Sequence, residues 1–278
     1  MTDNLKNTNL EAEGVEIISN IEFGKGGKRL LLLDAFRLKG KQDKPMPVII
    51  WIHGGGWSDP NLDKMYRPES QIIRLVKRGY FCVSIEYRLS TESVFPAQIQ
   101  DCKCAVRFLR AKADEYNIDP EKIGVWGESA GGHLAALLGV TEDVKEFEGN
   151  GGWNEYSSGV QAVCEWYGPS DFVLSTRDNN DVESAVARLI GGSIKENQDK
   201  LWAASPIKYV RKGLPPFLIM HGDVDKLVPF EQSKIFYDEL KKAKVEVDIC
   251  VVKGQGHGFF EGDNYYNTIF NFFDKHLK

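Results

Sequence analysis

The stretch Val125-Trp126-Gly127-Glu128-Ser129-Ala130-Gly131-Gly132-His133 decides the fold of this chain. The mostly apolar run Lys122–Trp126 is expected to form a strand that ends here, and His133–Leu138 is expected to continue as a helix. Ser129 therefore lies at the tip of a sharp strand-to-helix turn, with a glycine two residues away on either side. Such a turn requires small neighbours, and it lifts the serine hydroxyl clear of the sheet. In this setting the Gly-x-Ser-x-Gly pattern predicts a nucleophile elbow.

The rest of the chain alternates between apolar runs and helical patterns. After an initial hairpin, the other expected strands are Val48–Ile52, Tyr80–Ile85, Val160–Tyr167, Phe217–Met220 and Val245–Val252. This alternation predicts an α/β fold, with a mostly parallel central sheet flanked by helices, in a single domain over residues 1–278. The connection from Gly168 to Pro216 is too long for an ordinary loop. We expect a small lid there, at about residues 169–215, inserted after the sixth strand.

Length and composition exclude several classes of protein. The chain has 278 residues, 42% of them apolar and 27% charged, so it can bury a large core. A net charge of −5 without a basic run argues against nucleic-acid binding, and no apolar stretch reaches membrane-spanning length. The polar start lacks a signal-peptide pattern, which predicts a cytoplasmic protein, or a secreted one whose signal peptide has been removed. The five cysteines lack zinc-ligand spacing and are expected to be reduced.

Ser129 requires a base, because a free serine hydroxyl is a poor nucleophile at neutral pH. Ligands of parallel α/β sheets bind at the carboxyl ends of the strands. Of the five histidines, only His257 follows the last expected strand on a glycine-flanked loop that can reach Ser129. An acid must then orient the imidazole. The candidates Asp223 and Asp225 stand two residues apart and point the same way in an extended chain, so periodicity leaves both open.

Seven motifs between about Val48 and Phe260 resemble those of α/β-hydrolase serine esterases. They are His53-Gly-Gly-Gly-Trp57, Glu86-Tyr-Arg-Leu89, Phe95-Pro-Ala97, Gly127-Glu-Ser-Ala-Gly-Gly-His133, Tyr167-Gly-Pro-Ser-Asp171, His221-Gly-Asp-Val-Asp225-Lys-Leu-Val-Pro229 and Gly256-His-Gly-Phe259. The chain is similar to the acetyl-esterase and hormone-sensitive-lipase-like group. It most resembles small bacterial carboxylesterases of the bifunctional feruloyl/acetyl-xylan esterase type. It departs from lipase-like relatives at Glu128, where they usually carry aspartate, and before Val15, where they carry a helical cap.

The resemblance assigns a role to each residue of the expected site. Ser129 is the nucleophile, His257 is the base, and Asp225, three residues before the valine of Val-Pro, is the acid. Asp223 is instead expected to cap its own turn. The backbone N–H groups expected to bind the oxyanion are those of Gly55, Gly56 and Ala130.

Four residues are expected to bind substrate, and Trp166, at the end of a strand, is the best candidate for a pocket wall. They are Trp57, Trp166, Glu128 and Phe259. The other polar groups look structural, and Arg88 and Asp101 are expected either to pair across a strand-to-helix loop or to be separately solvated.

The expected function is a serine carboxylesterase that hydrolyses short-chain acyl esters through an acyl-enzyme on Ser129. The resemblance adds acetyl and feruloyl esters of plant polysaccharides as candidate substrates. We expect no metal and no cofactor, a small-molecule or carbohydrate-linked ester as the partner, and no nucleic acid or membrane; the oligomeric state stays open. The alternatives are an arylformamidase-like amide hydrolase, which shares a His-Gly-Gly-x-Trp loop, and a non-catalytic binding protein on the same scaffold.

Overall fold

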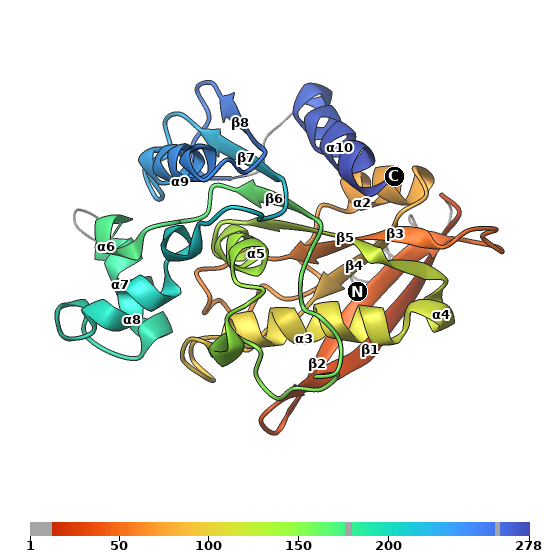
Figure 1. Cartoon of the computed structure of the whole chain (residues 1–278), viewed down its shortest axis with the longest axis horizontal. Coiled ribbons are helices and arrows are strands. Elements are labelled where there is room, and N and C mark those ends of the chain that lie inside the picture. The colour runs from red at the N-terminus through yellow and green to blue at the C-terminus, as the bar shows by residue number, and fades with distance from the viewer. Residues whose placement is uncertain (1–12, 176–179, 259–261) are drawn as a thin grey trace.

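The computed structural model describes residues 13–175, 180–258 and 262–278, and it contains an eight-stranded sheet between helices (Figure 1). The strand order is β1-β2-β4-β3-β5-β6-β7-β8. The hairpin of the first two strands is antiparallel, β2 pairs antiparallel with β4, and all other neighbours are parallel. The bounds are β1 (Val15–Gly26), β2 (Arg29–Leu38), β3 (Met46–Ile52), β4 (Phe81–Ile85), β5 (Ile118–Glu128), β6 (Ala162–Trp166), β7 (Phe217–Gly222) and β8 (Val247–Val252).

The helices connect these strands in the order that the sequence predicts. They are α2 (Glu69–Lys77), α3 (Ala97–Ala111), α4 (Ala113–Tyr116), α5 (Ala130–Val140), α6 (Phe172–Ser175), α7 (Asn180–Ile190), α8 (Gln198–Ala204), α9 (Glu231–Lys242) and α10 (Asp263–Leu277), with 3₁₀ turns η1 (Lys145–Phe147), η2 (Ile194–Glu196) and η3 (Pro206–Tyr209). The helices α3 and α4 are separated at Lys112, whose φ of −104° departs from helical geometry. Within the described ranges, no helix is long and apolar enough to cross a bilayer.

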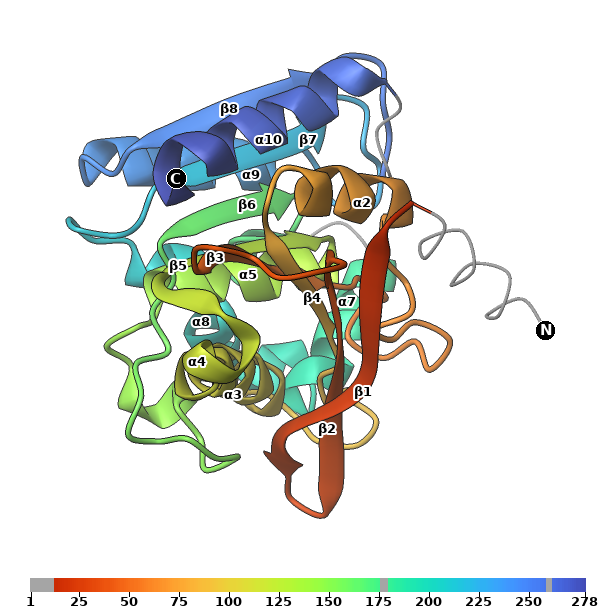
Figure 2. The ribbon, with the colours of Figure 1, turned by 90° about the vertical axis from the view of Figure 1, so that its right-hand side faces the viewer.

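The central strands are apolar on both faces because helices cover the sheet on each side. On β3, Val48, Ile50 and Ile52 belong to the core shared with α3, α5 and α9. Ile49 and Trp51 alternate with them and belong to the core shared with α2 and α10. Figure 2 shows α2 and α3 on opposite sides of the central strands. The prediction of a mostly parallel α/β sheet with helices on both faces is therefore confirmed.

The connection from β6 to β7 contains three α-helices, which lie together at one end of the molecule (Figure 1). Val186 and Leu189 of α7 and Leu201 of α8 are fully buried in the core on the α5 side of the sheet. Ser170 ties the beginning of this connection to α9, because its hydroxyl donates to Gln232 O at 2.7 Å. An insertion after the sixth strand is thus present, and its action as a lid stays a prediction.

Arg88 and Asp101 form the expected pair between the end of β4 and the start of α3. The Arg88 guanidinium donates to both carboxylate oxygens, at 2.8 and 2.7 Å, and the Arg88 N–H donates to the same carboxylate at 2.8 Å. Asp101 is 2% exposed, so this two-point contact fixes the loop from inside the protein. The five cysteines are all unpaired, as the sequence predicts.

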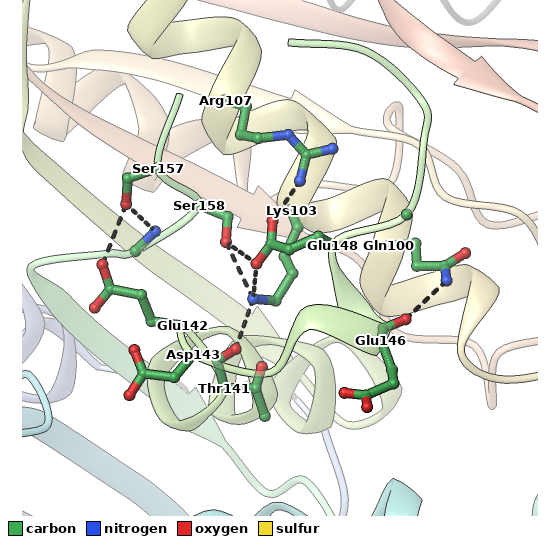
Figure 3. Close-up of polar contacts among 12 residues, drawn as sticks. Gln100, Lys103, Arg107, Thr141, Glu142, Asp143, Glu146, Glu148, Ser157 and Ser158 are labelled. Atoms are coloured by element: carbon green, nitrogen blue, oxygen red, sulfur yellow. Dashed lines mark hydrogen bonds and ion pairs between the residues drawn. The ribbon is translucent and has the colours of Figure 1, made fainter. Parts of the chain in front are cut away.

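A second buried ion cluster joins α3 to the loop before β6 (Figure 3). Lys103 is fully buried, and its Nζ donates to Thr141 O, Glu148 Oε1 and Ser158 Oγ at 2.7, 2.7 and 3.0 Å. Arg107, also buried, donates to the other oxygen of Glu148 at 2.6 Å. Burial lowers the pKa of Lys103, and the Glu148 carboxylate opposes that shift. The loop is therefore held by two buried cations.

Removing this carboxylate should destabilise the fold. We expect Glu148→Ala to lower the free energy of unfolding by about 2–4 kcal/mol, because Lys103 and Arg107 then remain charged in buried positions without their counter-ion. Urea unfolding at pH 7 measures the effect. Glu146→Ala is the matched control in the same loop, since the Glu146 side chain is exposed. Equal free energies of unfolding for the two variants would show that the contacts of Glu148 with Lys103 and Arg107 do not stabilise the fold.

Candidate active site

The turn between β5 and α5 has the strained geometry that the sequence predicts. Ser129 has φ 49° and ψ −117°, a conformation that is unfavourable for a residue with a side chain. A Cβ on Gly127 would overlap the carbonyl of Gly131, and a Cβ on Gly131 would overlap the carbonyl of Ile52. The Ser129 N–H donates to Trp166 O at 2.8 Å, which ties the tip of the turn to β6. The two glycines thus let the helix begin directly against the strand ends.

Three side chains from distant parts of the chain meet at this turn. His257 Nε2 lies 2.9 Å from Ser129 Oγ, and His257 Nδ1 lies 2.7 Å from Asp225 Oδ2. Because the carboxylate can only accept, Nδ1 carries the hydrogen, and Nε2 is free to accept the serine proton. The Asp225 side chain is fully buried, whereas that of His257 is 19% exposed. Burial alone would raise the pKa of Asp225, but hydrogen bonds from His221 and His257 hold it well below its usual value.

The structure distinguishes the two candidate acids. Asp225 faces His257, whereas the exposed Asp223 accepts from Gly254 N–H at 2.6 Å. Asp223 therefore ties its turn to the loop that carries the histidine, rather than capping its own turn as the sequence suggests. A backbone bond from Val224 N–H to Gln255 O, 3.1 Å long, adds to this contact. The acid turn and the histidine loop thus lie side by side.

The glycine run after β3 forms the opposite wall of the site. Gly55 and Gly56 have φ of +98° and +54°, which glycine adopts without strain. The buried Tyr87 hydroxyl lies within hydrogen-bonding distance of His53 O and Gly54 O, at 3.1 and 3.0 Å, and so holds the loop from behind. Ala130 is the first residue of α5, where backbone N–H groups have no partner within the helix. The three predicted oxyanion donors therefore lie around Ser129, and their role stays a prediction.

A cavity of about 290 Å³ opens in front of the serine. Its walls combine an apolar side, from Leu62, Tyr66 and Leu227, with polar groups near the nucleophile. The residues that line it are Gly54, Gly55, Gly56, Leu62, Tyr66, Glu128, Ser129, Tyr167, Leu227, His257 and Gly258. The predicted substrate residue Glu128 thus borders the cavity, whereas Phe259 lies outside the described residues.

Two predicted substrate residues lie elsewhere. Trp166 is fully buried and stacks edge-on against Trp126 at 4.9 Å, in the core under α10, because its position on β6 points it to the far face of the sheet. Trp57 is 4% exposed, and its indole N–H donates to His133 at 3.2 Å. Neither lines the cavity in the described structure, and a role of Trp57 and Trp166 in substrate binding stays a prediction. Tyr167, the residue that follows the end of β6, is the side chain that lines the cavity.

Glu128 lies beside the nucleophile in a largely buried position. Its Oε2 accepts from the Tyr167 hydroxyl at 2.7 Å. Burial raises the pKa of Glu128 to about 7, against the opposing effects of the Tyr167 hydrogen bond, the His257 charge and the Gly54 N–H. The Tyr167 ring packs edge-on against His257 at 4.8 Å. Glu128 and Tyr167 therefore form a buried polar pair that borders both the oxyanion loop and the base.

Sequence reasoning missed Glu165, a second carboxyl group behind the turn. It is 2% exposed, on β6, and accepts a hydrogen bond from Gly168 N–H. Burial raises its pKa to about 8, and the Gly168 N–H opposes that shift only in part. An acidic residue within an apolar strand run was the available signal, since such a residue is rarely buried without a partner.

The pH dependence of stability should expose this buried carboxyl. A glutamate in an unfolded chain ionises near pH 4.3, whereas Glu165 stays protonated in the folded protein up to about pH 8. The contribution of Glu165 to the free energy of unfolding is therefore fully present below the pKa of the unfolded chain. It is lost as the pH rises through the pKa of the folded protein, by up to about 1.4 kcal/mol per pH unit.

We expect the free energy of unfolding of Glu165→Gln to fall less between pH 5.5 and 8 than that of the wild type. Glutamine keeps the acceptor for Gly168 and cannot ionise. Urea titrations at several pH values measure the slope, with the exposed Glu155→Gln as control. Parallel pH profiles for wild type and Glu165→Gln would contradict the assignment.

Comparisons with known proteins agree with this geometry. The family model described as BD-FAE matches residues 33–240. Esterase LipC of Mycobacterium tuberculosis is 33% identical over 231 residues, which are 82% of this chain and 57% of LipC. The chain spans about half the length of the curated relatives it matches.

Solved structures extend the match to nearly the whole fold. A truncated carbohydrate esterase from gut microbiota superposes with a TM-score of 0.85 and 34% identity, over 94% of this chain and 95% of that one. Structures of an esterase of Thermogutta terrifontis, one with butyrate bound and one phosphorylated by paraoxon, each give a TM-score of 0.74 and 26% identity, over 94% of this chain and 91% of theirs. This chain therefore has the α/β-hydrolase fold and belongs to the BD-FAE family.

Proposed function

We propose that this protein is a serine carboxylesterase that acts through an acyl-enzyme on Ser129. The observation that carries the proposal is the continuous chain of contacts from Ser129 Oγ to His257 Nε2 at 2.9 Å and from His257 Nδ1 to Asp225 at 2.7 Å. These distances are short enough for proton transfer and for orientation of the imidazole. The esterases among the relatives support the same reaction class.

Each group has one task in this reaction. His257 Nε2 takes the proton of Ser129 as its oxygen bonds to the ester carbonyl carbon, and Asp225 stabilises the imidazolium that forms. The carbonyl oxygen becomes negative and is held by backbone N–H groups of Gly55, Gly56 and Ala130. His257 then donates its proton to the leaving alcohol, whose bond to carbon breaks. A water activated by the same imidazole releases the acid and restores the serine.

Loss of the nucleophile should abolish turnover. We expect Ser129→Ala to lower kcat by several orders of magnitude on a nitrophenyl ester while the melting temperature stays close to that of the wild type. The wild type should also be labelled by a fluorophosphonate, and the variant should not. A purified, folded variant that keeps a tenth of the activity would remove Ser129 from the mechanism. Absence of labelling in the wild type would favour the non-catalytic scaffold.

We infer that the preferred substrates carry short acyl groups. The cavity of about 290 Å³ is at the small end for a ligand site, and a long chain requires an extended apolar tunnel. The butyrate-bound structure of the Thermogutta terrifontis esterase supports the same range. The relative described as a carbohydrate esterase supports acetylated or feruloylated sugars as the alcohol or acyl source.

A panel of esters tests this substrate class. We expect kcat/KM for acetyl to butyryl nitrophenyl esters to exceed that for dodecanoyl esters by at least about 10-fold, because each further methylene has no apolar wall to contact. Methyl ferulate, acetylated xylan and an aryl formamide complete the panel. A higher kcat/KM for the dodecanoyl ester would overturn the short-chain proposal, and exclusive turnover of the formamide would favour the amide hydrolase.

Variants of the two aspartates should differ in kcat in the same assay. We expect Asp225→Asn to lower kcat by roughly 10³–10⁴, because an amide cannot hold the imidazole in the required tautomer. Asp223→Asn should keep kcat and lower stability by about 1 kcal/mol, since its bond to Gly254 is weakened. Kinetics at saturating substrate and urea unfolding measure the two effects. An inactive Asp223→Asn beside an active Asp225→Asn would reverse the assignment of the acid.

A further inference from the structure

A second histidine contacts the same carboxylate oxygen of the acid as His257. His221 lies near the carboxyl end of β7 and is fully buried. Its Nε2 lies 3.2 Å from Asp225 Oδ2 and 2.8 Å from Val228 O. Its Nδ1 lies 2.7 Å from the hydroxyl of Ser233, in the first turn of α9. His221 thus connects the beginning of α9 to the acid and to the turn that carries it.

The partners of His221 fix where its hydrogen lies. Nε2 faces a carboxylate and a carbonyl, and both groups can only accept, so Nε2 must carry the hydrogen. Nδ1 can then accept from the Ser233 hydroxyl, which donates. This arrangement satisfies both ring nitrogens of a neutral imidazole in a fully buried position. Asp225 and Val228 therefore select the tautomer, and Ser233 satisfies Nδ1 and orients the ring.

The contacts of Asp225 show what this N–H group adds. Oδ1 accepts from the backbone N–H groups of Leu227 and Val228, at 2.9 and 3.0 Å. Oδ2 faces His257 at 2.7 Å and His221 at 3.2 Å. Without His221, Oδ2 would have His257 as its only partner among the contacts described, and the carboxylate would be held in place through Oδ1 alone. The additional donor fixes the oxygen that orients the base.

Neighbouring rings restrict His221 to this orientation. Phe230 packs edge-on against it at 5.8 Å, and Tyr167 does so at 6.3 Å. The same Tyr167 ring packs against His257 at 4.8 Å. The two imidazoles are therefore held by a shared aromatic side chain as well as by a shared carboxylate. Phe230, Tyr167 and Ser233 thus contact His221 from three parts of the chain.

We propose that His221 is a positioning residue of the triad, whose Nε2–H, oriented by Ser233, holds Asp225 Oδ2 against His257 Nδ1. This inference rests on the proposed serine-esterase function. It extends the chain of contacts from Ser129, His257 and Asp225 to a second histidine and then to a hydroxyl on α9. His221 touches no reacting atom, so its effect should appear in kcat and in the His257–Asp225 hydrogen bond.

Two substitutions of His221 distinguish the effect of its hydrogen bond to Asp225 from the effect of the space that its side chain fills. In His221→Gln the side-chain amide reaches about as far as Nε2 and can still donate to Asp225, whereas in His221→Asn it is too short. We expect His221→Asn to lower kcat roughly 10-fold to 100-fold with KM changed less than about twofold, as a small misplacement of a catalytic group does. His221→Gln should recover most of that loss. Ser233→Ala should lower kcat several-fold, because Nδ1 loses the partner that orients the ring.

Ser158→Ala is the matched control for Ser233→Ala. It also removes a buried serine hydroxyl, from the Lys103 cluster (Figure 3), and should lower stability without changing kcat. Melting temperatures of all variants accompany the kinetics. The low-field proton resonance of His257 Nδ1–H gives a readout that needs no turnover. We expect that resonance to shift or broaden in His221→Asn and Ser233→Ala, and to stay in place in Ser158→Ala.

The outcomes distinguish this inference from the proposed function. A wild type without ester turnover would refute the function, whereas the proton resonance would still test whether His221 positions Asp225. Unchanged kcat and an unchanged resonance in folded His221→Asn and Ser233→Ala would overturn the positioning role. Equal losses of kcat in His221→Asn and His221→Gln would also overturn it, because packing rather than the donated hydrogen bond would then be responsible. Should His221→Asn fail to fold, Ser233→Ala decides the question alone.

Discussion

The close approach of the start of α5 to the ends of β3 and β5 is the constraint on which the rest of the structure depends. Gly127 and Gly131 allow this approach, because a Cβ at either position would occupy the place of a carbonyl oxygen. The turn between them forces Ser129 to a φ of 49°. This strain is sustained by the surrounding sheet, in which β5 is paired on both sides. The hydroxyl that results stands at the meeting point of three loops.

Those three loops are held by different means. The glycine run is held from behind by Tyr87, the acid turn by backbone donors to Asp225, and the histidine loop by contacts with the acid turn. Each is anchored by hydrogen bonds within the protein, so none depends on the substrate for its shape. Pre-organised groups of this kind contribute most to transition-state stabilisation, because they require no rearrangement when charge develops. Burial of Glu128 and Glu165 is energetically unfavourable for the ionised form of each carboxyl group and raises the pKa of both.

The sequence predicted the sheet and the helices on both faces, because local patterns carry that information, whereas the choice of Asp225 over Asp223 came from the resemblance to serine esterases. Apolar runs mark buried strands, and the glycines of a strained turn cannot be replaced by other residues. The residues that form the wall of the cavity were harder to predict from the sequence. Trp166 ends β6 and Tyr167 follows it, and which of the two faces the site depends on a register that the sequence alone does not show. The contact of His221 with Asp225 was equally hidden, because it depends on the path of a turn between two elements. The ion pairs of the loop residue Glu148 were hidden for the same reason, since its partners lie on α3.

The placement of α7 relative to the glycine run has a consequence for how related proteins can diverge. A Cβ on Gly56 would lie 3.9 Å from Ala185 of α7, so this helix packs behind the loop, yet no residue of the β6–β7 connection beyond Tyr167 lines the cavity in the described structure. Beyond Tyr167, the described part of this connection therefore supplies no side chain to the cavity that faces Ser129. Its helices can be lengthened, shortened or exchanged without replacing a residue that lines the cavity, while a larger side chain at position 185 would press on the glycine run. Diversification in this family can thus proceed through the supporting layer, with the reacting atoms left in place.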